Sequence, residues 1–542
     1  MSSRKPTARW GACLLAGVVA LAAQLGCEED KPQGPELETT GPIRIDALIV
    51  VPKSAVPTDT VSLSVQITSE SQNVGDFPVV EWAASGGSFV ENNKLAVRWV
   101  APALPQIYEI SCQARNSVNT VSASTHLFVG GPVTLIPNRT GEMRMFPNGE
   151  DFYYLRTTDI EDGVEIYSFI DSVEADAIPG VFLGESFSFS PDLALAAFHK
   201  EGDAGSGVLD QPYDVLLDDL VAGTETQITA DGAPAGYLRK HQNRYPYVSP
   251  DGNIIAYQSL HPYPFQGFVD TFDVYVYYRN SMTTVAVTGP SHGPATDRGK
   301  RRNYFPTVST DGRWMTFVSD RTRSNVWEMY GLPITGGVVA TDSASVVKLT
   351  STGGTVTAGA PSNLPRPTMR WSPTQPVLGV LTAAGSVRLV DLAGTRRETA
   401  LGGISGTIRD FRWSSDGQAL AISTGTSLYT ADISGAATLQ HQAEPGDNIR
   451  DMRFSPDDNW VIYRVQRASV AWFEIVDIGA GVLEEAVVLT KAATTGALAA
   501  YGRTMDMSPR VGAGDKLYMI TFNPAPEQTP RIEWLDLSTI TP

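Results

Sequence analysis

The stretch that decides the fold runs from residue 304 to residue 332 and reads YFPTVSTDGRWMTFVSDRTRSNVWEMYGL. An apolar run leads into the turn STDG, and a second apolar run follows the turn. In such a turn Asp bonds the backbone two residues on, and Gly accepts a positive φ where the chain reverses. The stretch therefore predicts two adjacent antiparallel strands, with a third strand after them.

The same pattern recurs along the chain after Gly131, with a period of roughly 40 to 60 residues. The turns are FPNG at Phe146, SPDL at Ser190, SPDG at Ser249, STDG at Ser309, SPTQ at Ser372, SSDG at Ser414, SPDD at Ser455 and SPRV at Ser508. In the clearest copy, apolar runs at 451–454, 460–463, 470–476 and 485–489 predict four strands. Four strands per unit, repeated around an axis, describe the blades of a β-propeller. We expect an all-β chain with an eight-bladed propeller, or alternatively a seven-bladed one.

The two ends of the repeat region predict how the ring closes. The last unit reaches its third strand at residues 531–537, and five residues follow it. The run Val133-Thr134-Leu135-Ile136 precedes the first complete unit and is flanked by two prolines, which edge strands tolerate. We predict that this run completes the last blade.

These copies resemble the WD40-like (PD40) repeats of TolB-type propellers. The resemblance is strongest where Ser319-Asp320-Arg321 follows a strand, and it covers residues 131–542. It implies the propeller fold. It implies little about function, because the repeat is a structural device that serves many ends.

The N-terminus has the pattern of an exported chain. Basic residues precede an apolar run from Trp10 to Leu25, which is typical of a secretory signal. The run ends in AAQLGC at residues 22–27, which resembles the lipobox of bacterial lipoproteins, although Gln24 stands where that family usually has an aliphatic residue. The resemblance implies a signal peptide over 1–26, lipid on Cys27 and an outer-membrane lipoprotein in the cell envelope. Plain secretion and an uncleaved anchor are the alternatives.

Two segments separate this leader from the repeats. Residues 27–42 are acidic and rich in Pro and Gly, which favours a flexible tether. Residues 43–130 carry short alternating runs that predict a small β-sandwich. The runs are 43–51, 61–67, 79–82, 94–99, 107–112 and 122–129. Trp82 is the expected core aromatic, and Cys112 is expected to be a buried thiol. The run YEISCQARN resembles the late strand of immunoglobulin-like and PKD-like domains, and we favour a spacer role.

Charge and missing motifs restrict the function. The chain has 41 Lys and Arg against 59 Asp and Glu, a net charge of −18, which argues against nucleic acid as a partner. No nucleophile elbow in a strand–turn–helix setting, no H-E-x-x-H and no Cys-x-x-Cys is found. We therefore predict no enzyme, no metal and no cofactor. A lyase or glycosidase with carboxylates at the propeller axis is the alternative, and a purely structural protein is a third.

Basic and aromatic residues cluster in the third and fourth units. They precede the first strand or follow the second strand, two positions that open on the same propeller face. The candidate binding residues are Arg239, Lys240, Arg244, His261, Tyr263, Phe265, Arg298, Lys300, Arg301, Arg302, Arg321 and Arg323. Arginine and aromatic side chains are enriched at binding hot spots. We predict that they form one rim that binds a protein or a cell-envelope glycan. Solvated loops that balance an acidic chain are the alternative.

Overall fold

The computed structural model describes most of the chain after residue 39. The described residues are 40–72, 75–130, 133–137, 143–145, 151–157, 162–168, 173–179, 187–192, 194–201, 213–229, 242–260, 272–288, 302–322, 326–342, 344–351, 368–393, 397–468, 470–479, 485–490, 493–494, 505–507, 516–522 and 530–536. Every regular element in these ranges is a β-strand. The expectation of an all-β chain is confirmed for them.

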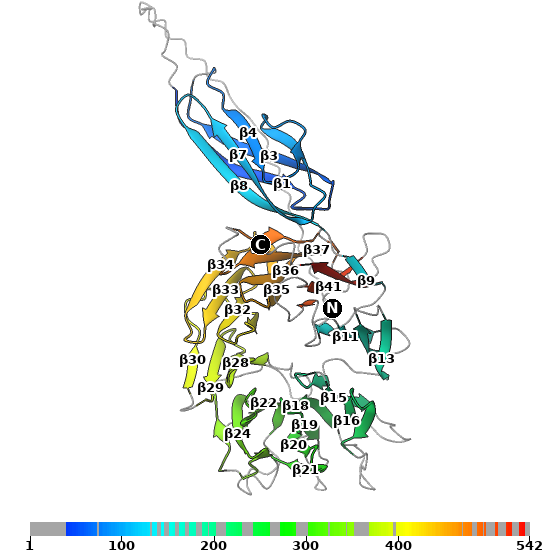
Figure 1. Ribbon diagram of the computed structural model, residues 1–542. Coiled ribbons are helices and arrows are strands. Elements are labelled where there is room, and N and C mark those ends of the chain that lie inside the picture. The colour runs from blue at the N-terminus through cyan, green and yellow to red at the C-terminus, as the bar shows by residue number, and fades with distance from the viewer. Residues whose placement is uncertain are drawn as a thin grey trace, which may run out of the picture.

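The first eight strands form two sheets, which we call the N-terminal unit (Figure 1). One sheet has the order β1 (Ile43–Val51), β3 (Thr60–Ser69), β6 (Ala96–Val100) and β5 (Ser88–Phe89). The other has the order β2 (Ser54–Ala55), β8 (Thr120–Val129), β7 (Gln106–Arg115) and β4 (Val79–Ala84). All neighbours are antiparallel except β2 and β8, which run parallel.

A common core joins the two sheets. Val61, Leu63 and Trp99 from one sheet and Trp82 and Cys112 from the other are buried in one cluster. Alternate residues of β3 are buried, as a strand with one face on a core requires. Burial raises the pKa of the Cys112 thiol to about 11, which keeps it protonated and unreactive at neutral pH. Each of the six predicted runs overlaps a strand. The sequence patterns missed only the two-residue strands β2 and β5.

The remaining strands form sheets that follow one another round a ring (Figure 1). The first two are β10 (Met143–Met145), β11 (Asp151–Thr157), β12 (Asp162–Ser168) and β13 (Val173–Pro179), and then an eight-stranded sheet of β14 (Phe187–Phe189), β15 (Leu195–Glu201), β16 (Tyr213–Asp219), β17 (Thr224–Gln227), β18 (Gln242–Val248), β19 (Ile254–Leu260), β20 (Phe272–Tyr278) and β21 (Thr283–Ala286). The next two are β22 (Asn303–Val308), β23 (Trp314–Ser319), β24 (Glu328–Thr335), β25 (Val338–Val339) and β26 (Val347–Lys348), and then β27 (Met369–Trp371), β28 (Val377–Leu381), β29 (Val387–Asp391) and β30 (Arg397–Ala400). The last three are β31 (Asp410–Trp413), β32 (Ala419–Ser423), β33 (Ser427–Asp432) and β34 (Ala437–Gln442), then β35 (Asp447–Phe454), β36 (Trp460–Arg467), β37 (Val470–Asp477), β38 (Val487–Val488) and β39 (Ala493–Thr494), and finally β40 (Met505–Met507), β41 (Lys516–Phe522), β42 (Pro530–Asp536) and β9 (Val133–Pro137).

Within the ring, consecutive strands pair antiparallel. In the eight-stranded sheet a single parallel pair, Tyr213 with Gln242, joins β14–β17 to β18–β21. Buried apolar residues fill the space between neighbouring sheets, as Val276 and Phe317 do in one such cluster. Sheets of about four strands arranged radially define a β-propeller, as the sequence predicted.

The ring closes as predicted. The run that precedes the first sheet forms β9 and pairs antiparallel with β42, with Ile136 opposite Ile532 and Val133 opposite Trp534. The last sheet therefore takes three strands from the C-terminal end of the chain and its outer strand from a segment before the first sheet.

The repeated turns owe their stability to serine as much as to Asp and Gly. In five turns the serine hydroxyl donates to the Asp carboxylate two residues on, at 2.5 to 2.7 Å, and accepts from the backbone N–H five residues on, at 2.9 to 3.0 Å. The five serines are buried: Ser190, Ser249, Ser309, Ser414 and Ser455. The predicted turns at Phe146 and Ser508 extend over residues outside the described ranges.

The turn at Ser455 shows why one copy reads SPDD. Asp458 occupies the position of Gly and has a φ of 58°. Its carboxylate accepts hydrogen bonds from the Ser415 hydroxyl and from the backbone N–H groups of Ser415 and Asp416 in the preceding turn. Asp458 therefore joins two neighbouring sheets, and its hydrogen bonds compensate for the cost of its positive φ.

Replacing Ser455 with alanine should destabilise the fold by about 1–3 kcal/mol, because the buried N–H of Trp460 loses its acceptor. Ser434 is a matched control: its hydroxyl also donates to an Asp two residues away, but it is exposed. Urea denaturation followed by circular dichroism should show a clear shift for Ser455→Ala and almost none for Ser434→Ala. Equal shifts would show that the buried turn has no special role.

Candidate functional site

Most residues of the predicted rim lie outside the described part of the chain. Those outside the described residues are Arg239, Lys240, His261, Tyr263, Phe265, Arg298, Lys300, Arg301 and Arg323, and Cys27 is outside them too. Arg244, Arg302 and Arg321 are described, and their surroundings differ from the solvated rim that was expected.

The predicted rim must be corrected at Arg302, because this residue is buried. Only 6% of the residue is exposed, and its Nη2 lies 2.6 Å from Oδ2 of Asp320. Its Nε donates to the same oxygen, and its guanidinium lies 4.6 Å from the centre of the Trp327 ring. The prediction that Arg302 is exposed for a partner is wrong, since its charge is neutralised inside the chain.

Arg321 is partly buried at the end of β23. Its guanidinium lies 5.1 Å from the ring centres of both Phe317 and Tyr330, and its Nη2 donates to Asn303 at 3.3 Å. Cation–π contacts of this kind hold a guanidinium in place. Arg321 therefore has a fixed position at the end of its sheet where β22 begins.

Arg244 lies within β18 and not in the loop before it. It neighbours His199, whose pKa is lowered to about 3, mainly by burial and then by the charge of Arg244. The His199 imidazole is neutral at physiological pH as a result. The ring of Tyr245 packs edge-on against His199 and against Phe305 of the next sheet, with 5.0 Å between the centres of Tyr245 and Phe305.

The strands β18, β22 and β35 each contain a β-bulge that the sequence did not predict. The register shifts between Arg244 and Tyr247, between Tyr304 and Thr307, and between Arg450 and Arg453. In each bulge one residue has a positive φ, and these are Tyr245, Phe305 and Asp451. β-Bulges redirect side chains and are common beside functional sites.

A second group of charges lies on β27, β31 and β35, the first strands of three consecutive sheets, and on β36, which pairs with β35. Arg370 Nη2 lies 3.1 Å from Asp410 Oδ1, and Arg412 Nη2 lies 3.3 Å from Asp410 Oδ2. Arg464 Nε donates to Asp451 at 2.8 Å. Burial raises the pKa of Asp410, and nearby Arg370 opposes that shift while Asp451 adds to it. The group can orient a polar ligand or hold two carboxylates close together.

The sequence contained a signal for this group. Residues 409–413 read RDFRW before the turn SSDG, and residues 450–454 read RDMRF before SPDD. An Arg followed by an aromatic residue and Ser recurs at Arg370, Arg412 and Arg453, so the repeat places these residues at equivalent positions on consecutive sheets. Aligning the copies on the turn serine would have found them.

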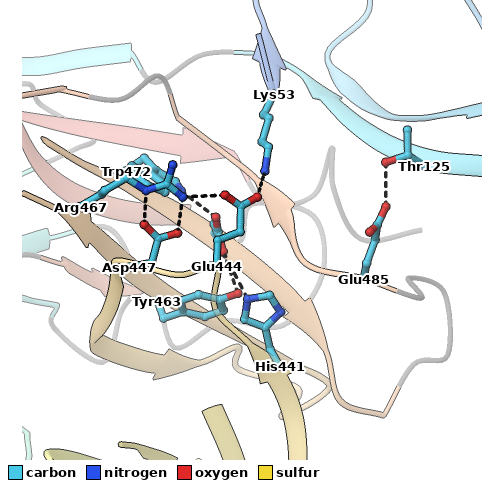
Figure 2. Close-up of polar contacts among 10 residues, drawn as sticks. Lys53, Thr125, His441, Glu444, Asp447, Tyr463, Arg467, Trp472 and Glu485 are labelled. Atoms are coloured by element: carbon cyan, nitrogen blue, oxygen red, sulfur yellow. Dashed lines mark hydrogen bonds and ion pairs between the residues drawn. The ribbon is translucent and has the colours of Figure 1, made fainter. Parts of the chain in front are cut away.

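A third polar group lies where the N-terminal unit meets the ring (Figure 2). Lys53 Nζ lies 2.6 Å from Glu444 Oε1, and the other oxygen of Glu444 accepts from Arg467 at 2.6 Å. Lys53 and Arg467 together lower the pKa of Glu444 to about 2. Thr125 donates to Glu485 at 2.7 Å. The N-terminal unit is therefore docked on the ring.

Beneath that contact, Glu474 of β37 accepts hydrogen bonds from its own sheet and lies near His441 of the neighbouring sheet β31–β34 (Figure 2). It accepts from the Tyr463 hydroxyl at 2.9 Å and from Trp472 Nε1 at 2.6 Å. His441 Nε2 lies 3.9 Å away, and burial lowers the pKa of His441 while Glu474 opposes the shift. The carboxylate is thus occupied by structural hydrogen bonds.

Across the described ranges no three His, Cys, Asp or Glu side chains are grouped to hold a metal ion. None of the described segments is a helix with the length and apolar character to cross a membrane. The stretch GPSHG at residues 289–293 has the spacing G-x-S-x-G and follows β21, but it falls outside the described residues.

The comparisons with known proteins concern the fold. No family model and no curated protein matches the chain. Similar solved structures include the dihydro-heme d1 dehydrogenase NirN, which is 12% identical over 71% of this chain and 72% of that chain, with a TM-score of 0.42. The β-propeller domain of the Trilobed protease from Pyrococcus furiosus is 10% identical over 66% and 97%, with a TM-score of 0.36. TolB from Acinetobacter baumannii is 14% identical over 71% and 82%, with a TM-score of 0.27.

These structures correct one prediction. Prolyl endopeptidases and the tricorn protease are also similar to this chain, which covers 55% and 38% of their respective lengths. Together with the dehydrogenase, they overturn the prediction that the chain is not an enzyme, because proteins of similar architecture include enzymes. At identities this low the likeness assigns no activity. The chain is a β-propeller protein whose solved structural neighbours include TolB.

Proposed function

We propose that the chain is an envelope-tethered β-propeller that docks a protein or a cell-envelope glycan on one face of the ring. The observation that carries this proposal is the position of the N-terminal unit, which projects from the rim of the ring and covers neither face in Figure 1. A ring held by its edge leaves loops at both faces accessible. Loops on a rigid scaffold are common sites of binding.

The proposal includes a division of the chain. Residues 1–26 are a signal peptide, Cys27 carries lipid in the outer membrane, 27–42 are a tether, 43–130 are an immunoglobulin-like sandwich and 131–542 are the propeller. The strand orders β1-β3-β6-β5 and β2-β8-β7-β4 support the sandwich, since they correspond to the two sheets of an immunoglobulin-like domain. The Tyr108 hydroxyl donates to the Leu104 carbonyl at 2.8 Å, as in a tyrosine corner. Counting β14–β17 and β18–β21 as separate blades gives eight.

The docking face is proposed to be the rim of the third and fourth blades, without Arg302. Its residues are Arg239, Lys240, Arg244, His261, Tyr263, Phe265, Arg298, Lys300, Arg301, Arg321 and Arg323. The strand register supports this grouping, because Gln242 pairs with Leu260 and Asn303 pairs with Ser319. The segments before each first strand and after each second strand thus start from the same end of their sheets.

Reversing the charge of Arg298, Lys300 and Arg301 together should remove the partner from material captured after crosslinking in intact cells. The control is Arg313→Glu, because Arg313 is exposed in the turn at the opposite end of the same sheet. Quantitative mass spectrometry should show partner recovery reduced at least tenfold in the triple variant and unchanged in the control. An unchanged partner set in the triple variant would reject this docking face.

A polysaccharide-active enzyme, a lyase or a glycosidase, is the second candidate. The observation that favours it is the placement of Asp410 and Asp451 on neighbouring first strands, with the pKa of Asp410 raised by burial. Wild-type protein should then cleave an envelope polysaccharide, and Asp410→Asn should lower the rate at least a hundredfold. Measurement of new chain ends would test this. Cleavage that persists in Asp410→Asn would remove these carboxylates from the mechanism.

A further inference from the structure

The closing strand of the ring is attached directly to the N-terminal unit. β8 ends at Val129 and β9 begins at Val133, so only residues 130–132 lie between them. Among the strands that the structure describes, β9 is the outer strand of its sheet and pairs only with β42. We call this pair of strands the seam. The strand that closes the ring, β9, is therefore held along one edge by its backbone pairing with β42 and at its first residue by the short link to the N-terminal unit.

An aromatic side chain of the N-terminal unit is inserted beside the seam. Phe128 is fully buried, and its cluster includes Trp460 and Phe473 of the sheet β35–β39, Leu489 directly after β38 and Leu535 of β42. Ile107 of β7 packs against the same cluster. Phe128 thus belongs to the core of the last two sheets, on either side of the boundary that β9 completes.

A polar contact holds the same unit at a second point. Lys53, Glu444, Arg467 and Asp447 form a chain of ion pairs, in which Arg467 Nε lies 2.5 Å from Asp447 Oδ1 (Figure 2). The side chains of Lys53 and Glu444 are 63% and 53% exposed, so salt will weaken their attraction. Phe128 lies on β8 and Lys53 lies between β1 and β2, so two separate points of contact fix the orientation of the unit as well as its position.

We propose that the N-terminal unit is a latch for the ring. Its docking on the sheet β35–β39 holds β9 in register with β42, and undocking allows the seam to open. The physical reason is effective concentration: a short link to a docked body keeps β9 close to its partner strand. This role goes beyond the proposed docking function and does not depend on it.

The latch is tested by hydrogen exchange of the full-length mature chain, measured by mass spectrometry. Phe128→Ala should raise exchange in peptides from β9 and β42 at least fivefold, and exchange in β28 and β29 across the ring should change less than twofold. The control is Phe77→Ala, which removes an exposed phenylalanine from the same unit. It should leave the seam unchanged.

A second variant decides the question if Phe128→Ala does not fold. Lys53→Glu places two carboxylates together at an exposed contact and leaves both cores intact. It should raise seam exchange about twofold at low salt, and 1 M NaCl should remove most of that increase. Seam exchange equal to wild type in the folded variants would overturn the latch, and so would an equal increase all round the ring.

Discussion

Replacing Asp320 with alanine is expected to destabilise the folded chain by about 3–5 kcal/mol. The change leaves the buried guanidinium of Arg302 without the carboxylate that accepts from its Nε, its Nη2 and its backbone N–H. Removing one partner of a buried ion pair lowers the free energy of unfolding by more than the intact pair contributes to it, because an uncompensated charge stays in a medium of low dielectric constant. Urea denaturation followed by circular dichroism would measure the loss.

The control for Asp320 is an ion pair with the same separation at the surface. Arg279 Nη2 lies 2.6 Å from Asp219 Oδ2, as Arg302 Nη2 does from Asp320, but Arg279 is 43% exposed. Arg279→Ala should cost less than about 1 kcal/mol. If Asp320→Ala costs no more than Arg279→Ala, Arg302 is hydrated in solution and the buried pair described here is wrong.

Replacing Trp460 with alanine is expected to destabilise the chain by a similar amount, about 3–5 kcal/mol. Trp460 is 1% exposed and lies in the cluster that Phe128, Ile462 and Leu535 share. The lost free energy of unfolding has two parts: the transfer free energy of the large side chain that is removed, and the cost of the cavity that remains. Because the cluster includes residues of the N-terminal unit and of the last two sheets, both should lose stability together in denaturation experiments.

The control for Trp460 is Leu439→Ala, which truncates a side chain that is 50% exposed on the neighbouring sheet. This variant should lie within about 0.5 kcal/mol of wild type. A Trp460→Ala protein that unfolds at the wild-type urea concentration would contradict the shared core.

The ring could be predicted from the sequence because its signals are local. Each turn contains its own Ser, Asp and Gly, and each strand carries apolar residues on the faces that neighbouring sheets cover. The orphan run at Val133 was informative because a blade without its outer strand leaves an unpaired edge. Strands β2 and β5 were missed because two residues show no alternation.

The charged residues could not be placed in the same way. Arg302 looked like part of a basic surface loop, since the sequence does not show that Asp320, 18 positions later, faces it across two strands. The contacts of the N-terminal unit were missed for the same reason: Lys53 and Glu444 are 391 positions apart. The spacer interpretation came from the resemblance to immunoglobulin-like domains, and that resemblance does not encode where the unit docks.

We propose above that one face of the ring binds an envelope partner through the third and fourth blades. The most direct test of this proposal is the dissociation constant of the purified mature chain for the partner recovered by in-cell crosslinking, measured by biolayer interferometry. We predict that Arg298→Glu, Lys300→Glu and Arg301→Glu together weaken binding at least tenfold, about 1.4 kcal/mol, while Arg313→Glu stays within twofold of wild type. Equal dissociation constants for wild type and the triple variant would contradict it.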